Sequence, residues 1–583
     1  MASSHLSASG HPPDPVDLPF NRWLARQTHG ISLVSVHLAY ADWLQHLLVL
    51  PSKQADLIGS AVAKWLQWLQ YAAQSWLGTG TAPVAPALRD KRFSRSDWNQ
   101  PPFNALAQAF LLQQQWWAEA MTGVRGVSRH HEEMVAFTTR QWLDMWSPSN
   151  FIATNPQVQQ KTLATGGTNL LNGWAHWWRD ALAVLGDGKA RGVEKFIPGQ
   201  TVATTPGEVV FKNSLIELIQ YRAATETVDV EPVLIIPSWI MKYYILDLTP
   251  HNSLVAYLVE QGHTVFMVSW KNPTSEDRDL AFNDYLELGV MQALQAIQRL
   301  RPQTSIHAMG YCLGGTLLAI AAASLPDGGE RVLKTVTLLA AQTDFHEPGE
   351  LGLFIDECQI AFLEDLMAER GYLDGRQMAG AFALINSKDL VWSKLVHEYL
   401  MGARTPMTAL RAWNADATRL PARMHSEYLR RLYLQNDLAE GRYRVAGKAI
   451  RLGDIKLPLC VVGTERDHVS PWKSVYQVNR LVSGPVDFVL TAGTHNAGIV
   501  NPPAGPAAHS QAGFRAASHA PGAAPDDPQE WFDRMPLRGG SWWPFWDEWL
   551  HDHSSGTMAP AAIKALAFEG APLPAPGLYV HQA

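Results

Sequence analysis

Residues 306–318 read IHAMGYCLGGTLL, and this stretch decides how the second half of the chain folds. Its core, Gly-Tyr-Cys-Leu-Gly at 310–314, has the spacing of a nucleophile elbow, a sharp turn from a strand into a helix. Glycines on either side of the nucleophile avoid side-chain clashes, and the N-terminus of the following helix favours an anion. The central position is usually Ser, but here it is Cys312. The stretch predicts a thiol nucleophile at the end of a buried strand.

Strands and helices alternate around this elbow. Short apolar runs at 232–237, 264–270, 336–341, 456–463 and 486–493 are typical of buried parallel strands. Between the first two we predict a helix capped by Thr249, with Pro250 at its first position and Gly262 at its end. Such alternation implies a mostly parallel sheet with right-handed crossovers and helices on both faces. We therefore predict an α/β fold of the α/β-hydrolase type.

The chain divides into segments of different pattern. We predict a disordered tail over 1–16, a helix-rich N-terminal domain over 17–200 and the catalytic α/β domain over 201–583. Helical sequence at about 345–440 interrupts the strand rhythm and predicts an inserted cap. The Pro-, Ala- and Gly-rich stretch 502–527 predicts a loop, and for the Trp-rich tail after residue 541 we hypothesise contact with a granule surface.

One predicted N-terminal helix, at 61–77, leaves two interpretations open. Val62, Trp65, Leu66 and Leu69 recur at helical spacing and form one apolar stripe. The stripe either packs into the core of a helical domain or forms a surface that meets a polymer or a granule protein.

Composition excludes several classes of protein. Apolar residues make up 47 % of the 583 residues and the formal charge is −7, which suits a globular protein and not a nucleic-acid binder. Three scattered cysteines fit neither a disulfide framework nor a zinc site, so we expect a reducing compartment and no metal. The N-terminus lacks the features of a signal peptide and no run approaches 18 apolar residues. We expect a cytoplasmic protein without a transmembrane segment.

Two further residues complete a candidate triad. In this fold an acid and then a His follow the nucleophile, each after its own strand. Asp467 falls just past the strand at 456–463, and His495 falls past the strand at 486–493. We predict Cys312, Asp467 and His495 as the catalytic residues, with His468 as a weaker rival base. For the oxyanion we expect backbone N–H groups of Leu313 and of Trp239 or Ile240.

Sulfur favours acyl transfer over hydrolysis. A thiol beside a His and a helix N-terminus forms a thiolate easily and is a strong nucleophile at neutral pH. Attack on a thioester by a thiolate exchanges one thioester for another, so the acyl-enzyme retains the potential to acylate an alcohol. A Ser acyl-enzyme would be an ordinary ester with less drive to form another.

With these residues placed, the chain resembles the polyhydroxyalkanoate synthases. The similarity includes the lipase-like box GYCLGGT and, beyond it, 202–221, 237–273, 284–290, 344–357 and 413–421. The resemblance is to the single-subunit, class I/II-like synthases, as a divergent branch. Two departures lie close to the predicted pocket: Met241 stands where many members have Asn, and Thr494 separates Gly493 from His495.

The resemblance implies an activity and partners. Cys312 would carry the growing acyl chain, His495 would activate it, and Asp467 would assist His495 or deprotonate the 3-hydroxyl of the incoming unit. The substrate would be an (R)-3-hydroxyacyl-CoA, with release of CoA and no other cofactor. The product would be an insoluble polyester, the protein a homodimer, and its location the surface of cytoplasmic granules.

Two alternatives stay open from the sequence. A thioesterase or an intracellular polyester depolymerase would use the same triad and release free acid. A non-enzymatic granule-binding homologue would keep the fold but would be unaffected by Cys312→Ala.

Overall fold

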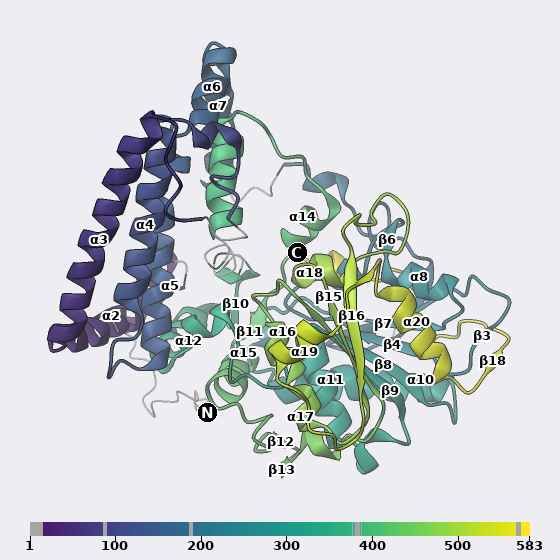
Figure 1. Ribbon diagram of the computed structural model, residues 1–583. Helices are drawn as coiled ribbons and strands as arrows, with labels where there is room; N and C mark the ends of the chain where they lie inside the picture. Colours follow the sequence, from purple (N-terminus) through teal and green to yellow (C-terminus); the bar gives the residue numbers. More distant parts are fainter. Residues whose placement is uncertain are drawn as a thin grey trace. The chain divides into compact units, whose positions relative to one another are not determined.

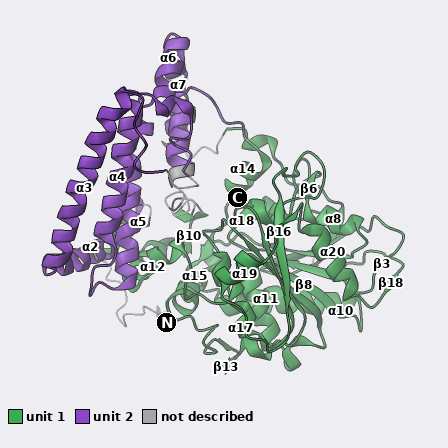
Figure 2. Ribbon diagram, in the orientation of Figure 1, with its two compact units in different colours: residues 1–24, 191–378, 407–583 green, residues 25–190, 379–406 purple. Residues whose placement is uncertain are grey.

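The computed structural model describes residues 16–28, 30–85, 90–185, 191–375, 377–378, 380, 385, 387–566 and 573–583. The predicted tail over 1–16 lies outside these residues except for Val16. The chain forms two compact units, one made of residues 1–24, 191–378 and 407–583 and the other of 25–190 and 379–406 (Figure 2).

The first unit contains a large mixed sheet (Figure 1). Its centre is a run of parallel strands in the order β15 (Val486–Thr491), β14 (Leu459–Thr464), β9 (Leu333–Leu339), β8 (Ile306–Tyr311), β4 (Val233–Ile236) and β7 (Val265–Trp270). Antiparallel strands extend both sides: β16 (Gly513–His519) and β17 (Arg538–Gly539) beyond β15, and β2 (Ile216–Tyr221), β1 (Gly207–Lys212) and β19 (Leu573–Pro574) beyond β7. The predicted α/β-hydrolase fold is confirmed.

Two local predictions are wrong. Helix α8 (Leu254–Glu260) begins after Thr249 and Pro250, and Ser253 caps it by accepting the Ala256 N–H at 2.9 Å. The stretch 502–527 contains strand β16, which pairs with β15 along its length. The role of the Trp-rich tail at a granule surface stays a prediction, although Trp542, Trp543 and Trp546, on α20 (Trp543–Asp552) and at its N-cap, are at most 1 % exposed.

The inserted segment after β9 contributes to both units. Helices α12 (Glu357–Arg370), α14 (Ala409–Asn414) and α15 (Ala422–Tyr428) belong to the sheet-containing unit, whereas 379–406 belong to the helical one. Within the helical unit, Asp180 pairs with Lys394 at 3.0 Å and with Arg404 at 2.6 Å. The sequence pattern did not predict this division of the insertion.

The helical unit is built from α2 (Leu33–Leu48), α3 (Pro51–Trp76), α4 (Phe103–Met121), α5 (Arg129–Met145), α6 (Pro156–Ala164) and α7 (Thr168–Leu185). Side chains of α2, α3, α4 and α5 form a buried cluster that includes Ala39, Leu57, Met121 and Met134. Within the described residues, only the pair α2 and α3, bent at 94°, is apolar and long enough to span a membrane, and no single helix is.

The stripe on α3 does not pack inward. Trp65 is 59 % exposed and Leu66 is 54 % exposed, and Val62 and Leu69 are also exposed. The interpretation of this stripe as part of a core is therefore wrong.

Candidate active site

The elbow forms where the sequence predicts it. Cys312 lies between β8 and helix α11 (Leu313–Ser324). Its backbone has φ 53° and ψ −125°, a conformation that residues other than Gly rarely adopt. A Cβ on Gly310 would lie 2.4 Å from the Gly315 Cα, and one on Gly314 would lie 2.2 Å from the Ile236 carbonyl oxygen. Both glycines are required because the helix passes so close to the two strands.

Asp467 and His495 meet at the same edge of the sheet. Asp467 follows β14 and His495 begins α18 (His495–Ile499) after β15, and Asp467 Oδ2 lies 2.7 Å from His495 Nδ1. The other oxygen, Oδ1, accepts the N–H groups of Val469 at 2.9 Å and Ser470 at 2.8 Å. The Thr464 hydroxyl donates to Oδ2 at 2.9 Å. These bonds hold the carboxylate in place, and the carboxylate in turn fixes the orientation of the imidazole through Nδ1.

His495 also interacts with the thiol. The charge of Cys312, which is partly buried, helps to raise the pKa of His495. The structure therefore brings all three predicted triad residues together, in the order Cys312, His495 and Asp467. The rival His468 does not hold this position, because the ring nitrogen bonded to Asp467 belongs to His495.

Electrostatics favour an ion pair at this site. Burial disfavours the imidazolium, but the charges of Asp467 and Cys312 and their hydrogen bonds outweigh it, so the pKa of His495 is raised well above its ordinary value. Burial would raise the pKa of Asp467. The charge and hydrogen bond of His495, together with the hydrogen bonds from Ser470 and Thr464, outweigh burial and lower the pKa. An imidazolium next to a thiol is the arrangement by which cysteine enzymes generate their nucleophile.

The Trp-rich segment holds the short helix that carries His495. The indole N–H of Trp542 donates to the Gly498 carbonyl at 3.1 Å, and that of Trp543 donates to the Ile499 carbonyl at 2.9 Å. Both carbonyls belong to α18, which begins at His495. From the end of β8, the Tyr311 hydroxyl donates to Asn496 Oδ1 at 2.6 Å. These bonds fix the short helix that carries the base.

The predicted oxyanion donors lie on the expected elements. Leu313 opens α11 directly after the thiol, and Trp239 and Ile240 follow β4. The Ile240 N–H donates to Ser238 Oγ at 3.3 Å, and the Trp239 ring is buried. The assignment of these N–H groups to an oxyanion stays a prediction.

Two tyrosines near the thiol were missed by sequence reasoning. Tyr428 and Tyr433 come from the insertion, and the charge of Cys312 acts on both, although burial is the main reason that their pKa values are raised. The same insertion reaches the loop after β4, where the Thr418 N–H donates to the Ile240 carbonyl at 3.2 Å. The insertion therefore brings side chains close to the thiol, and no strand-order rule could have pointed to these two residues. Its role as a cap over the site stays a prediction.

Comparison with known proteins identifies the family of the chain. Family models match at residues 11–53 (poly-beta-hydroxybutyrate polymerase N terminal), 89–258 (poly-beta-hydroxybutyrate polymerase (PhaC) N-terminus) and 231–502 (alpha/beta hydrolase fold). The poly(3-hydroxyalkanoate) polymerase of Methylorubrum extorquens is 41 % identical over 86 % of this chain and 83 % of its own length. The poly(3-hydroxyalkanoate) polymerase subunit PhaC of Cupriavidus necator is 36 % identical over 86 % and 85 %.

Among solved structures, an alpha/beta hydrolase fold protein from Chitinophaga pinensis aligns with 51 % of this chain and 92 % of its own, at 14 % identity and a TM-score of 0.29. The two polymerases match along most of their own length and most of this chain. By this likeness the chain belongs to the poly(3-hydroxyalkanoate) polymerase family.

Proposed function

We propose that this protein polymerises (R)-3-hydroxyacyl-CoA into polyester with release of CoA, through a thioester on Cys312. The observation that carries the proposal is Cys312 at the turn of a nucleophile elbow, close to His495, which is hydrogen-bonded to Asp467. No cofactor other than the CoA thioester substrate enters this scheme.

In the first half-reaction the Cys312 thiolate attacks the thioester carbonyl. The bond between Cys312 Sγ and the acyl carbon forms, the bond between that carbon and the CoA sulfur breaks, and the leaving thiolate takes the proton of the His495 imidazolium. The raised pKa of His495 supports this role, because the imidazolium must be present before the attack.

In the second half-reaction a 3-hydroxyl group attacks the Cys312 thioester. An oxygen–carbon bond forms, the carbon–sulfur bond breaks, and neutral His495 accepts the hydroxyl proton, which restores the thiolate and imidazolium. Asp467 already accepts bonds from Val469, Ser470 and Thr464, so it suits the orientation of His495 better than removal of a proton from substrate.

The test uses purified protein with (R)-3-hydroxybutyryl-CoA and, in parallel, a medium-chain homologue. We expect CoA release together with chloroform-soluble polymer, and loss of both in Cys312→Ala. Release of CoA with free acid alone would make the protein a thioesterase. Turnover that persists in Cys312→Ala would remove the thiol from the mechanism.

We also propose that the protein is a homodimer on the surface of cytoplasmic polyester granules. The helical unit supports granule contact, because α3 and α7 each expose an apolar face. On α7 these exposed side chains include Leu171, Trp174 and Trp178, and the rings of Trp174 and Trp178 stack. Sedimentation of the purified protein tests the dimer, and fractionation of polymer-producing cells tests the location.

A further inference from the structure

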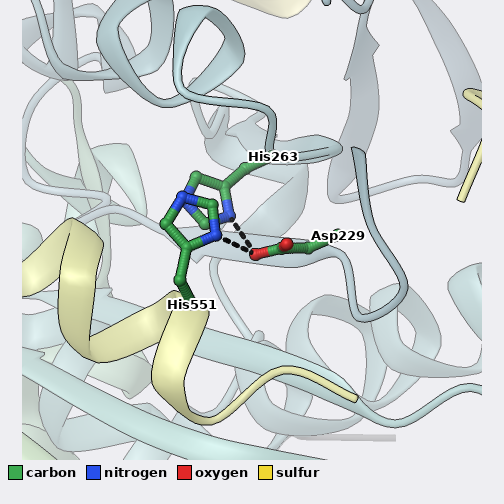
Figure 3. Close-up of side chains that lie close together, drawn as sticks. All are labelled: Asp229, His263 and His551. Carbon is green, nitrogen blue, oxygen red and sulfur yellow. Dashed lines mark ion pairs between the residues drawn. The ribbon is translucent and has the colours of Figure 1, made fainter. Parts of the chain in front are cut away.

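A second cluster of ligand-type side chains lies at the opposite edge of the sheet from Cys312. Asp229 belongs to the short strand β3 (Val228–Asp229), which precedes β4, and His263 lies two residues before β7. His551 comes from α20 (Figure 3). Cys312, Asp467 and His495 follow the carboxyl ends of their strands, whereas Asp229 and His263 lie before the amino ends of β4 and β7. The cluster therefore has no part in the acyl-transfer chemistry.

The three side chains converge on one point. Asp229 Oδ2 lies 3.3 Å from His263 Nδ1 and 2.8 Å from His551 Nδ1, and one ligand atom from each residue lies within 4.8 Å of the others. Figure 3 shows both rings turning a nitrogen toward the same carboxylate oxygen. The backbone fixes part of this arrangement, because the Asp229 N–H donates to the Gly262 carbonyl at 2.9 Å, next to His263.

The buried imidazole lies between two carboxylates. His263 is fully buried, and its Nδ1 forms an ion pair with Asp229 Oδ2 at 3.3 Å but, within the described part of the chain, no hydrogen bond. Its other nitrogen, Nε2, lies 2.8 Å from Asp547 Oδ1. Two buried carboxylates on either side of one ring need a positive charge between them, which a second ring proton or a metal ion can supply.

The spacing suits a zinc ion. Zinc binds His nitrogen and carboxylate oxygen at about 2.0–2.2 Å in tetrahedral geometry, which places ligand atoms about 3.3 Å apart. The separation of His263 Nδ1 from Asp229 Oδ2 is 3.3 Å. His551 sits closer, at 2.8 Å, but its side chain is 39 % exposed and can move outward by the small amount required. That exposure also leaves room for a water molecule as fourth ligand.

We propose that Asp229, His263 and His551 bind one zinc ion, with Asp547 as the carboxylate that orients His263. A metal ligand of this kind commonly donates its second N–H to a carboxylate, which sets the tautomer and the ring orientation. The ion would tie α20 to the amino edge of the sheet. Since Trp542 and Trp543 at the start of that helix hold α18, the site would stabilise the platform of His495 from a distance. This proposal replaces our expectation of no metal. The sequence did not indicate the cluster, because its residues are too far apart to form a recognisable metal-ligand spacing.

The test measures zinc binding directly and does not depend on activity. Untagged protein carrying Cys312→Ala, which removes the competing thiolate, is stripped with a chelator and titrated with Zn²⁺ in equilibrium dialysis, with bound metal counted by mass spectrometry. We expect about one tight equivalent per chain. Adding His551→Ala should abolish it, and adding Asp547→Asn should weaken it about 10–100-fold. His509→Ala, which removes an exposed imidazole elsewhere, should change nothing.

Thermal unfolding supplies a second measurement. Zinc should raise the melting temperature of the Cys312→Ala protein and of its His509→Ala derivative, but not that of its His551→Ala derivative. If His551→Ala fails to fold by circular dichroism, the isosteric Asp547→Asn decides the question. Equal zinc uptake with and without these substitutions, or no uptake by folded protein, would overturn the proposal and leave a hydrogen-bonded His and Asp network.

Discussion

At the scale of single residues, the thiol depends on its imidazole partner. The pKa of His495 is raised, so the imidazolium persists above pH 6.5, and a positive charge beside a thiol favours its nucleophilic form. An ordinary thiol, with a pKa of about 8.5, is about 1 % ionised at pH 6.5.

We therefore expect His495→Gln to slow alkylation of Cys312 by iodoacetamide at least about tenfold at pH 6.5, and much less at pH 9. Rates are read peptide by peptide in a mass spectrometer. Cys358 is exposed and distant from His495 in sequence, so its rate serves as an internal control and should not change. Equal rates for Cys312 in both proteins would show that the imidazole does not activate it.

The pair of His495 and Asp467 also makes a pH-dependent contribution to stability. The lowered pKa of Asp467 means that its contribution is present above the unfolded pKa of about 3.9 and is lost as pH falls through the folded value. The raised pKa of His495 means that its contribution is complete below about 6.5 and is lost as pH rises through the folded value.

The stability advantage of the unmodified protein over Asp467→Asn should accordingly be greatest between about pH 4 and pH 6.5 and should shrink on either side. Urea unfolding at a series of pH values measures it. The same variant should lose about 10²–10⁴-fold in the rate of CoA release, because the imidazole loses its orientation. A difference in stability that does not vary with pH would contradict the assigned charges.

At the scale of elements, the elbow depends on the close approach of α11 to β4. A Cβ on Gly314 would lie 2.2 Å from the Ile236 carbonyl oxygen, and backbone cannot move away as a side chain can. Gly314→Ala should therefore lower the free energy of unfolding by about 3 kcal/mol or more. In the same unit, Gly453→Ala would meet its nearest atom at 3.6 Å, so its urea midpoint should stay almost unchanged. Similar midpoints for both variants would refute this reading of the elbow.

The elements that the sequence predicted best are those with one dominant physical cause. Buried parallel strands must be continuously apolar, so β4, β7, β8, β14 and β15 could be located from their residues. The triad followed, because strand order fixes which loops share one edge of the sheet. Strand β16 was missed because its Ala, Ser and Gly residues carry no such pattern and its pairing with β15 is decided only by the folded sheet.

Other features depend on contacts that no local pattern reveals. An apolar run shows that a face favours burial but not whether the chain itself covers it. The sequence therefore left both interpretations of the stripe on α3 open, and it did not show that the Trp residues of α20 are buried. Tyr428 and Tyr433 reach the thiol only through the packing of the insertion. The cluster of Asp229, His263 and His551 unites segments more than 280 residues apart (551 minus 263 is 288).

At the scale of the whole molecule, the Trp residues fall into a buried group and an exposed group. The Trp residues of α20 serve the core of the sheet-containing unit, whereas those of α3 and α7 are exposed in the helical unit. Exposed apolar stripes of this size are unusual for a protein surface and indicate contact with another apolar surface. For a polymerase of this family, the apolar surface that its own reaction would create is the polyester.

We therefore expect Trp65→Gln with Leu66→Gln to weaken binding to washed polyester granules at least about tenfold, because each large side chain contributes about 1.5–3 kcal/mol when it leaves water. CoA release from soluble substrate should stay within about twofold, since neither residue belongs to the sheet-containing unit. The matched control, Gln67→Ala with Gln70→Ala, changes exposed polar positions of the same helix and should bind as before. Granule pelleting with both double variants measures the difference. If the two double variants bind granules equally well, α3 does not contact the polymer. Its stripe would then bind another surface, most directly a second copy of the chain, and sedimentation of the same variants would detect this.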